Sequence, residues 1–591
     1  MQKVLEPGAT IAPVILASDK TQLSRFSGDK QAWPIYLTIG NIDKSIRRKP
    51  SERATVLVGY IPVTKGECFS PAKRQFKGYQ LFHDLMGAIL KPLVEAGKSG
   101  VQMICADCRV RNVFPILSAY VADHPEQCLV TCCMENRCPR CVAGPNSLEV
   151  PTHSAFRDHS DTLRILTEQS QGLSPNEFKE QGLRPIWPFW ADLPHCDIFA
   201  CITPDLLHQL HKGLFKDHIV SWSTDAAEGG ACEIDARFKA MPPHPTLRHF
   251  KKGISLVTQW TGTEYKNMEK VFLGIIVGIA EPEVVRAVRG VLDFIYYAHF
   301  ETHDLRSLAK LDEAWVAFHR NKRIFIDLGI REHFNIPKVH SSKHYLEAIR
   351  SRGSAAGFNS EGMERLHIDY AKIGYRATNK KHYIKQMTRW LTRQEKIHHF
   401  AAYLQWAVPG YMSEPIILGP DIENEHDYLQ PTESEPLEQA SKCGYSIAKT
   451  PSYLNIPLKT VQDDFGADNI IPCIETYLRR LGRPVPHVAN PMFSLFKRMY
   501  VWIPAAPQVS DKPTKDTIIA TRPEGACGIR KKTIPGQFST VLVQESERTS
   551  NDPLDGVSIT DVTWFGMKAD KIYRPDCCSC SCNIQAPCSI W

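Results

Sequence analysis

The sequence predicts a mixed α/β protein in which a sheet-containing core is interrupted by a long helical segment. Three observations carry this prediction. Short β-rich runs bounded by Gly, Pro, Asn or Ser fill much of the first 125 residues, a helical period dominates from about residue 128 to 350, and a basic helical stretch follows. The composition, with 43% hydrophobic and 23% charged residues, is close to globular averages and excludes wholesale disorder.

The N-terminal region alternates strand signals with one clear helix. The expected strands are 12–18, 33–42, 54–63, 101–105 and 114–122. Residues 79–97 are expected to form a helix, because Leu81, Leu85 and Ile89 fall on one face. Three strands, a helix and a further strand that ends in an acid follow the element order of an RNase H-like sheet.

The middle of the chain has the pattern of a helical insertion, with helices expected over 203–222, 281–300 and 307–329. The expected organisation is 1–127 for the first part of the core, 128–350 for a zinc-knuckle-like segment and the helical insertion, 351–408 for the last part of the core with its basic helices, 409–440 for an acidic linker, 441–563 for a small α/β region, and 564–591 for a Cys-rich tail without order.

Charge and hydropathy limit the functional classes. The formal net charge of +7 permits nucleic acid as a partner without demanding it. The longest apolar run, 271–280, is far shorter than the roughly 20 residues that span a bilayer, so no membrane helix is expected. The N-terminus lacks the basic region of a secretory signal. Nineteen cysteines therefore point to reduced thiols or metal ligands rather than to a disulfide framework.

Three acids stand where two-metal chemistry needs them. Asp19 and Asp123 each end an apolar strand, and Glu361 opens a helix. Hard divalent cations prefer oxygen ligands, and two such ions activate a water and stabilise a leaving oxygen of a phosphodiester. Asp107 competes with Asp123, and Glu364 competes with Glu361 from the same helical face. Spacing alone is equally compatible with turn residues and helix caps.

The amino-acid sequence of four segments resembles that of the Plavaka transposases of fungal DNA transposons, which are related to the Kyakuja-Dileera-Zisupton and CACTA groups. These segments are 13–63, 114–141, 201–222 and 359–379, and the resemblance covers about residues 8–406. It implies an RNase H-like DDE core with a helical insertion, and cut-and-paste strand transfer with two Mg²⁺ or Mn²⁺ ions. The implied partner is double-stranded DNA, both transposon ends and target, in the nucleus; self-association into a homo-oligomer is compatible with it.

Carried over by motif, the resemblance implies Asp19, Asp123 and Glu361 as the catalytic triad, with Glu361 chosen as the first acid of its pair. Asp205 and His208 match the Asp/Cys-x-x-His motif of these groups, without a defined role. Relatives carry several hundred residues before the segment that begins near residue 8, so we expect an N-terminally truncated copy. Two hypotheses follow: a DDE transposase, active or degenerate, or a non-catalytic transposase-derived protein that binds DNA or other partners.

Cys138 and Cys141 form a C-x-x-C pair of the kind that binds Zn²⁺. Their partners are expected to be two of Cys128, Cys132 and Cys133, or a distant residue, and the favoured pair is Cys128 with Cys133. The alternative is that these thiols are small buried hydrophobes. The predicted metal is one structural zinc ion.

A basic run covers residues 371–396, which hold eight Lys or Arg and one Glu. Its position after Glu361 suggests contact with DNA, and Lys and Arg bind phosphates without reading sequence. The expected phosphate contacts are Arg376, Lys380, Lys381 and Lys385. A second basic turn covers residues 44–53. The alternative for both is a solvated surface.

Overall fold

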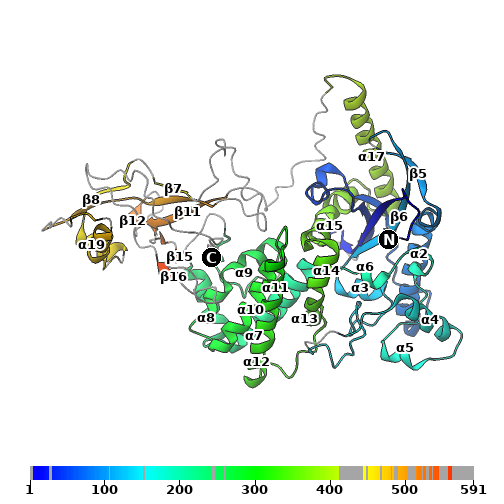
Figure 1. Ribbon diagram of the computed structural model, residues 1–591, viewed down its shortest axis with the longest axis horizontal. Coiled ribbons are helices and arrows are strands. Elements are labelled where there is room, and N and C mark those ends of the chain that lie inside the picture. The colour runs from blue at the N-terminus through cyan, green and yellow to red at the C-terminus, as the bar shows by residue number, and fades with distance from the viewer. Residues whose placement is uncertain are drawn as a thin grey trace. The chain divides into compact units, whose positions relative to one another are not determined.

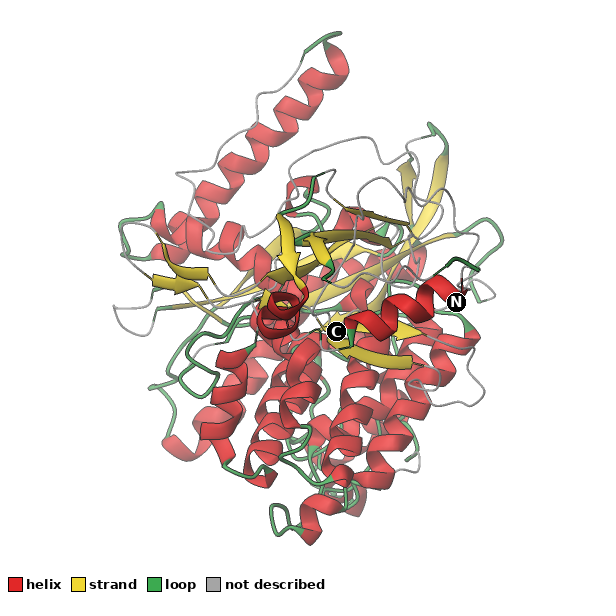
Figure 2. Ribbon diagram, turned by 90° about the vertical axis from the view of Figure 1, so that its left-hand side faces the viewer, coloured by secondary structure: helices red, strands yellow, loops and turns green. Residues whose placement is uncertain are grey.

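The computed structural model describes residues 4–411, apart from 25–29, 106, 151–153, 242–246 and 258–259, and short segments between 444 and 561. The fold is mixed α/β with a mixed sheet, as predicted, and both kinds of element are abundant (Figures 1 and 2). The chain divides into two compact units: residues 1–228, 261–266 and 276–422 form the first, and residues 229–260, 267–275 and 423–591 form the second.

A six-stranded sheet organises the first unit. Its strands are β1 (Thr10–Ser18), β2 (Thr21–Gln22), β3 (Gln31–Ile39), β4 (Val56–Ile61), β5 (Val101–Ile104) and β6 (Val110–Val121). The order is β2-β3-β1-β6-β5, with β4 also paired to β3. Only β1 and β6 are parallel; the other pairs are antiparallel. The five strands expected from the sequence correspond to β1, β3, β4, β5 and β6, and all five are confirmed.

Helix α2 (Pro71–Ser99) covers this sheet and is longer than the expected helix. Its buried apolar side chains are Phe82, Met86 and Leu90, which pack with Leu16 of β1 and Trp190 in one apolar cluster. The predicted stripe is half-buried beside them. The five C-terminal residues of β1 are all buried, which explains why that strand is a continuous apolar run rather than an alternating one.

The chain after β6 is mainly helical. Up to residue 226 it forms α3 (His124–Val130), α4 (His159–Ser170), α5 (Asn176–Glu180), α6 (Ile198–Cys201), the wide π-helix η3 (Leu206–Val220) and α7 (Ser221–Ala226). The expected helix over 203–222 is thus present, with π geometry over most of its length. Helices α10 (Pro282–Ala298) and α11 (Leu305–Asn321) pack closely, because Gly290 leaves room: a Cβ there would lie 2.6 Å from the Phe318 amide nitrogen.

The first unit ends in short helices and one long helix: α13 (Pro337–Ser341), the 3₁₀ turn η4 (Ser342–His344), α14 (Tyr345–Arg352), α15 (Glu361–His367), the π-turn η6 (Ile368–Ile373), α16 (Gly374–Arg376) and α17 (Tyr383–Ala407). Within the described part of the chain, no helix combines the length and apolarity that spanning a membrane requires.

The second unit contains α8 (Gly230–Ala240), α18 (Leu458–Phe465), α19 (Ile470–Arg480) and the strands β7 to β16, which include β8 (Tyr453–Pro457), β9 (Met492–Leu495), β10 (Arg498–Ile503) and β11 (Thr514–Thr521). A small apolar cluster of Val461, Phe465, Ile470, Phe493 and Leu495 holds β8 and β9 against the two helices α18 and α19. Nearly all of the expected acidic linker and the whole Cys-rich tail lie outside the described residues.

Candidate active site and metal centre

Asp19 and Asp123 come together because the strands that precede them are parallel neighbours. β1 and β6 pair with Ala17 opposite Val121, and each strand ends within two residues of its acid. The two carboxyl ends therefore meet at one edge of the sheet. Asp123 also caps α3, where its carboxylate accepts a hydrogen bond from the Glu126 amide at 3.0 Å. Both aspartates line one small cavity.

The residue of α15 that joins them is Glu364. It lines the same cavity, and ligand atoms of Asp19, Glu364 and His367 lie within 4.8 Å of one another. Glu361, one turn earlier, lines a different cavity, where its carboxylate lies 2.7 Å from Lys266 Nζ. The sequence interpretation favoured Glu361; the structure places its alternative, Glu364, beside the aspartates.

Asp205 and His208 fasten α15 to this cavity. The buried Asp205 carboxylate accepts hydrogen bonds from His208 Nδ1 at 2.8 Å and from the Ser360 amide at 3.1 Å. His208 Nε2 lies 3.5 Å from Glu364 Oε1. Burial alone lowers the pKa of His208, but hydrogen bonds to Asp205 and Glu364 raise it to about 10. The ring is therefore an imidazolium held between two carboxylates.

Asp19 lies in strongly acidic surroundings. Burial, and then the neighbouring charges of Glu126, Glu364 and Asp123, raise the pKa of Asp19 to about 8. Carboxylates gathered in this way repel one another, and a bound divalent cation relieves that repulsion. The arrangement is suited to holding hard cations through oxygen ligands.

Asp107, the alternative to Asp123, lies at the far end of β6. It occupies the turn between β5 and β6, and its carboxylate makes a two-point ion pair with Arg111 at 2.6 and 2.7 Å. The 12 residues of β6 span roughly 40 Å. Asp107 is therefore remote from the cavity that holds Asp19 and Asp123.

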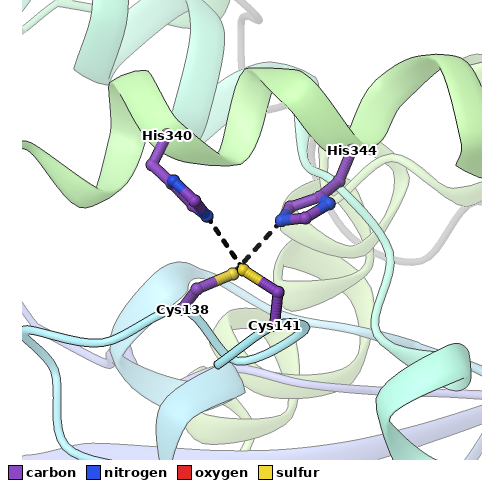
Figure 3. Close-up of side chains that lie close together, drawn as sticks. All are labelled: Cys138, Cys141, His340 and His344. Carbon is purple, nitrogen blue, oxygen red and sulfur yellow. Dashed lines mark hydrogen bonds between the residues drawn. The ribbon is translucent and has the colours of Figure 1, made fainter. Parts of the chain in front are cut away.

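Cys138 and Cys141 meet two histidines rather than further cysteines (Figure 3). His344 Nε2 lies 3.3 Å from Cys138 Sγ, and His340 Nε2 lies 3.1 Å from Cys141 Sγ. All four residues are buried, and their ligand atoms lie within 4.8 Å of one another. His340 and His344 lie four apart across α13 and η4, which places both rings on one helical face.

Further contacts orient these side chains. His340 Nδ1 lies 3.1 Å from the Leu148 carbonyl oxygen, to which it can donate, so Nε2 is left as the ring's ligand atom. The Arg140 amide donates to Cys138 Sγ at 3.4 Å. Two thiols and two imidazoles arranged in this way form a candidate metal site.

The cysteines favoured as partners lie elsewhere in the same region. Cys128 Sγ lies 3.6 Å from His124 Nε2, and Cys133 Sγ lies 3.3 Å from Thr131 Oγ1. Cys132 Sγ is 3.7 Å from His83 Nε2. These buried thiols pack in the core and are not members of the four-residue cluster.

The basic run is not one continuous helix, in contrast to the sequence prediction. Arg376 ends α16, Lys380 and Lys381 lie in a turn, and Lys385 belongs to α17. Side-chain hydrogen bonds of Thr378 to the Tyr375 carbonyl and the Lys380 amide break the helix, and Lys380 has a positive φ of 64°. All four basic residues are exposed.

Two aromatic residues of this run, Tyr375 and Tyr383, anchor it to the sheet. Tyr375 is buried and meets Tyr383 edge to face at 5.2 Å, and the Tyr383 hydroxyl donates to the Gln31 carbonyl at 2.9 Å. Tyr375 and Tyr383 hold this part of the basic run against the sheet, and the four cations face solvent.

Sequence reasoning missed four residues of these two sites, namely His340, His344, Glu126 and His367. His340 and His344 carried the signal H-x-x-x-H, which was detectable but lies about 200 residues from the cysteines. Glu126 is buried close enough to Asp19 for its charge to raise the pKa of Asp19, and it accepts a hydrogen bond from Ser18 and one from Trp33 Nε1 at 3.0 Å. Nothing in the sequence distinguishes it from an ordinary first-turn glutamate.

Comparison with known proteins agrees with the sequence resemblance. A search of the curated proteins finds no match to the chain. Residues 1–223 match the profile of the Plavaka transposase family. The matched region contains Asp19, Asp123, the cysteine pair and the Asp205–His208 motif. Residues 1–223 are therefore similar to the Plavaka transposase family, and this similarity supports a Plavaka-type transposase.

Proposed function

We propose that the chain is a DDE transposase that cuts DNA and transfers a strand, with Asp19, Asp123 and Glu364 as its catalytic acids. The observation that carries this proposal is the convergence of the three carboxylates on one cavity at the carboxyl edge of β1 and β6. The order of strands in the sheet also supports an RNase H-like core. The long strands β1, β3, β4 and β6 are the first to fourth in the chain, and across the sheet they lie in the order β4-β3-β1-β6.

The residues present fit divalent cations, since three carboxylates supply the oxygen ligands that Mg²⁺ and Mn²⁺ prefer. Two ions held there would activate the attacking hydroxyl and stabilise the leaving oxygen. Asp205 and His208 act as positioning residues: Asp205 fixes the Ser360 backbone at the start of α15, and His208 fixes the Glu364 carboxylate.

We also propose that Cys138, Cys141, His340 and His344 bind one structural Zn²⁺. Zn–S bonds of about 2.3 Å and Zn–N bonds of about 2.0 Å at tetrahedral angles place such atoms roughly 3.5 Å apart, close to the observed 3.1 and 3.3 Å. The ion would join the segment after α3 to the region of α13, and so tie together the two ends of the helical insertion.

The proposed partner is double-stranded DNA in the nucleus. The exposed Arg376, Lys380, Lys381 and Lys385 lie shortly after α15 in the sequence, and Tyr375 and Tyr383 hold their segment against the sheet. Phosphate contacts from such residues position a duplex without reading its sequence.

The proposal is tested by nicking of supercoiled plasmid with the full chain. The expected result is nicked circles with Mg²⁺ or Mn²⁺, none with EDTA, and loss of nicking in Asp19→Asn with DNA binding retained. Unchanged nicking by Asp19→Asn would contradict the role of Asp19 as a catalytic acid. DNA binding without any nicking by the parent protein would instead favour a non-catalytic transposase-derived protein.

A further inference from the structure

A second, larger cavity of about 350 Å³ lies next to the acid cavity in the first unit. Val121 and Met363 line both cavities, and α15 turns Glu361 toward the larger one and Glu364 toward the smaller one. Part of its wall is the basic turn at residues 44–53. The proposed chemistry at the three acids does not use this cavity.

The charged part of the wall is predominantly positive. Its cations are Lys44, Arg47, Arg48, Lys266 and Arg365, and its anions are Glu301 and Glu361. Glu301 is bound by Lys44 at 3.1 Å and Arg48 at 2.7 Å, and Glu361 is bound by Lys266 at 2.7 Å. Arg365 pairs with Asp369 at 3.5 Å. These ion pairs leave Arg47 as the cation of interest.

Arg47 is held in place by backbone groups alone. Its Nε donates to the Ile42 carbonyl at 2.9 Å and one terminal nitrogen donates to the Gly357 carbonyl at 3.1 Å. Among the residues that the structure describes, no carboxylate lies within ion-pair distance of Arg47. A half-buried guanidinium fixed in this way is pre-organised for an anionic oxygen, and phosphate matches its geometry.

The remainder of the wall suits an aromatic base. Ile15, Leu206 and Phe358 contribute apolar surface, and Asn359 donates to Glu361 at 3.0 Å at the polar edge. The volume falls in the range of about 300–1,000 Å³ of pockets that hold small organic ligands. A duplex, whose major groove alone is about 12 Å wide, does not fit such a space.

We propose that this cavity binds one unpaired nucleotide of the DNA strand that is cut at the acid cluster, with Arg47 on its phosphate. The inference rests on the proposed function, because the shared wall places the nucleotide next to the scissile phosphodiester. Enzymes that act on a single base take that nucleotide out of the stack and hold it in a pocket of this kind.

The test is fluorescence anisotropy of the full chain with no Mg²⁺ or Mn²⁺ added and no chelator, so that the proposed structural zinc is kept. It uses two labelled 20-base-pair probes, one blunt and one with three-nucleotide single-stranded tails at both 5′ and 3′ ends. The parent protein is expected to prefer the tailed probe. Arg47→Gln should weaken binding of the tailed probe by roughly tenfold and change blunt-probe binding less than twofold. Lys49→Gln is the matched control, since Lys49 belongs to the same basic turn but does not line the cavity.

Lys266→Gln is a second variant in the wall of the same cavity and provides the test if Arg47→Gln does not fold. It should produce the same selective loss, because Glu361 is left uncompensated beside the phosphate. Absence of a tail preference in the parent protein, or equal losses on both probes, would overturn the proposal. Cleavage plays no part in this measurement, so such a result beside a nicking-deficient Asp19→Asn would refute the pocket and leave the proposed function standing.

Discussion

Glu361 and Glu364 lie one turn apart on α15 and serve different cavities. Glu364 approaches Asp19 and is contacted by His208 Nε2 at 3.5 Å, whereas Glu361 pairs with Lys266 at 2.7 Å. The imidazolium of His208 keeps the pKa of Glu364 well below its usual range, so that carboxylate stays ionised and available to a cation.

This difference predicts which glutamate binds divalent metal. Glu364→Gln removes one of three clustered carboxylates and should weaken Mn²⁺ binding by more than roughly tenfold. Glu361→Gln should leave Mn²⁺ affinity within about twofold, because its partner is a lysine. Titration of the full chain with Mn²⁺, followed by electron paramagnetic resonance, measures both; the reverse order would restore Glu361 as the third acid.

The four-residue Cys/His cluster predicts one zinc ion per chain by elemental analysis. Cys141→Ser should abolish zinc binding and destabilise the protein by roughly 2–5 kcal/mol, as loss of a native cross-link does, since the ion would join segments 199 residues apart. Cys128→Ser is the control and should keep its zinc. Zinc lost from Cys128→Ser but kept by Cys141→Ser would point to the upstream cysteines instead.

His83 predicts a loss of stability at mildly acidic pH. Its Nδ1 accepts from the Phe189 amide at 3.2 Å while Nε2 lies 3.0 Å from the Leu129 carbonyl, so the buried ring is held neutral. Burial lowers the pKa of His83 from 6.5 to about 4. The contribution is fully present above pH 6.5 and is lost as the pH falls toward 4, amounting to about 2 kcal/mol between pH 8 and pH 5.

Urea unfolding of the parent protein and of His83→Gln at both pH values isolates this contribution, because glutamine offers the same donor and acceptor without titrating. The free energy of unfolding of His83→Gln should fall less on acidification. An equal fall in both proteins would show that His83 does not cause the acid sensitivity.

The exposed cations of the basic run at residues 371–396 predict a salt-dependent affinity for DNA. Replacing Arg376, Lys380, Lys381 and Lys385 with Gln should flatten the log–log salt dependence by roughly 0.9 for each phosphate that the variant no longer neutralises. All duplex sequences should be affected alike. The double variant Lys91→Gln/Lys98→Gln, on the exposed side of α2, is the control. Equal salt slopes for the quadruple variant and the parent would mark a merely solvated surface.

Much of the fold was accessible from the sequence, because β1, β3, β4 and β6 are continuous β-rich runs with clear punctuation. The orientation of α2 was less accessible: its deepest residues are Phe82, Met86 and Leu90, one position on from the predicted stripe. Which residues of a helix are buried most deeply depends on the side chains of the sheet against which it packs. The helical period of the sequence carries no information about those side chains.

The site was predictable in part, and for a physical reason. Asp19 and Asp123 were predictable because each follows the end of an apolar strand. Helical spacing places Glu361 and Glu364 on the same face, and only their contacts with Lys266 and His208 distinguish the two. The pairing of Cys138 with His344 spans 206 residues and depends on the tertiary fold alone. Local spacing therefore suggested nearby cysteines, which pack in the core instead.

The most direct test of the central claim is a change of metal preference in DNA nicking. A thiolate binds softer ions in preference to Mg²⁺, so Asp19→Cys and Glu364→Cys should fail with Mg²⁺ and recover activity with Mn²⁺ or Cd²⁺. Asp107→Cys, at the far end of β6, should nick with Mg²⁺ as the parent does. Full Mg²⁺-dependent nicking by Glu364→Cys, or no recovery of either site variant with Mn²⁺ or Cd²⁺, would contradict metal binding by these acids.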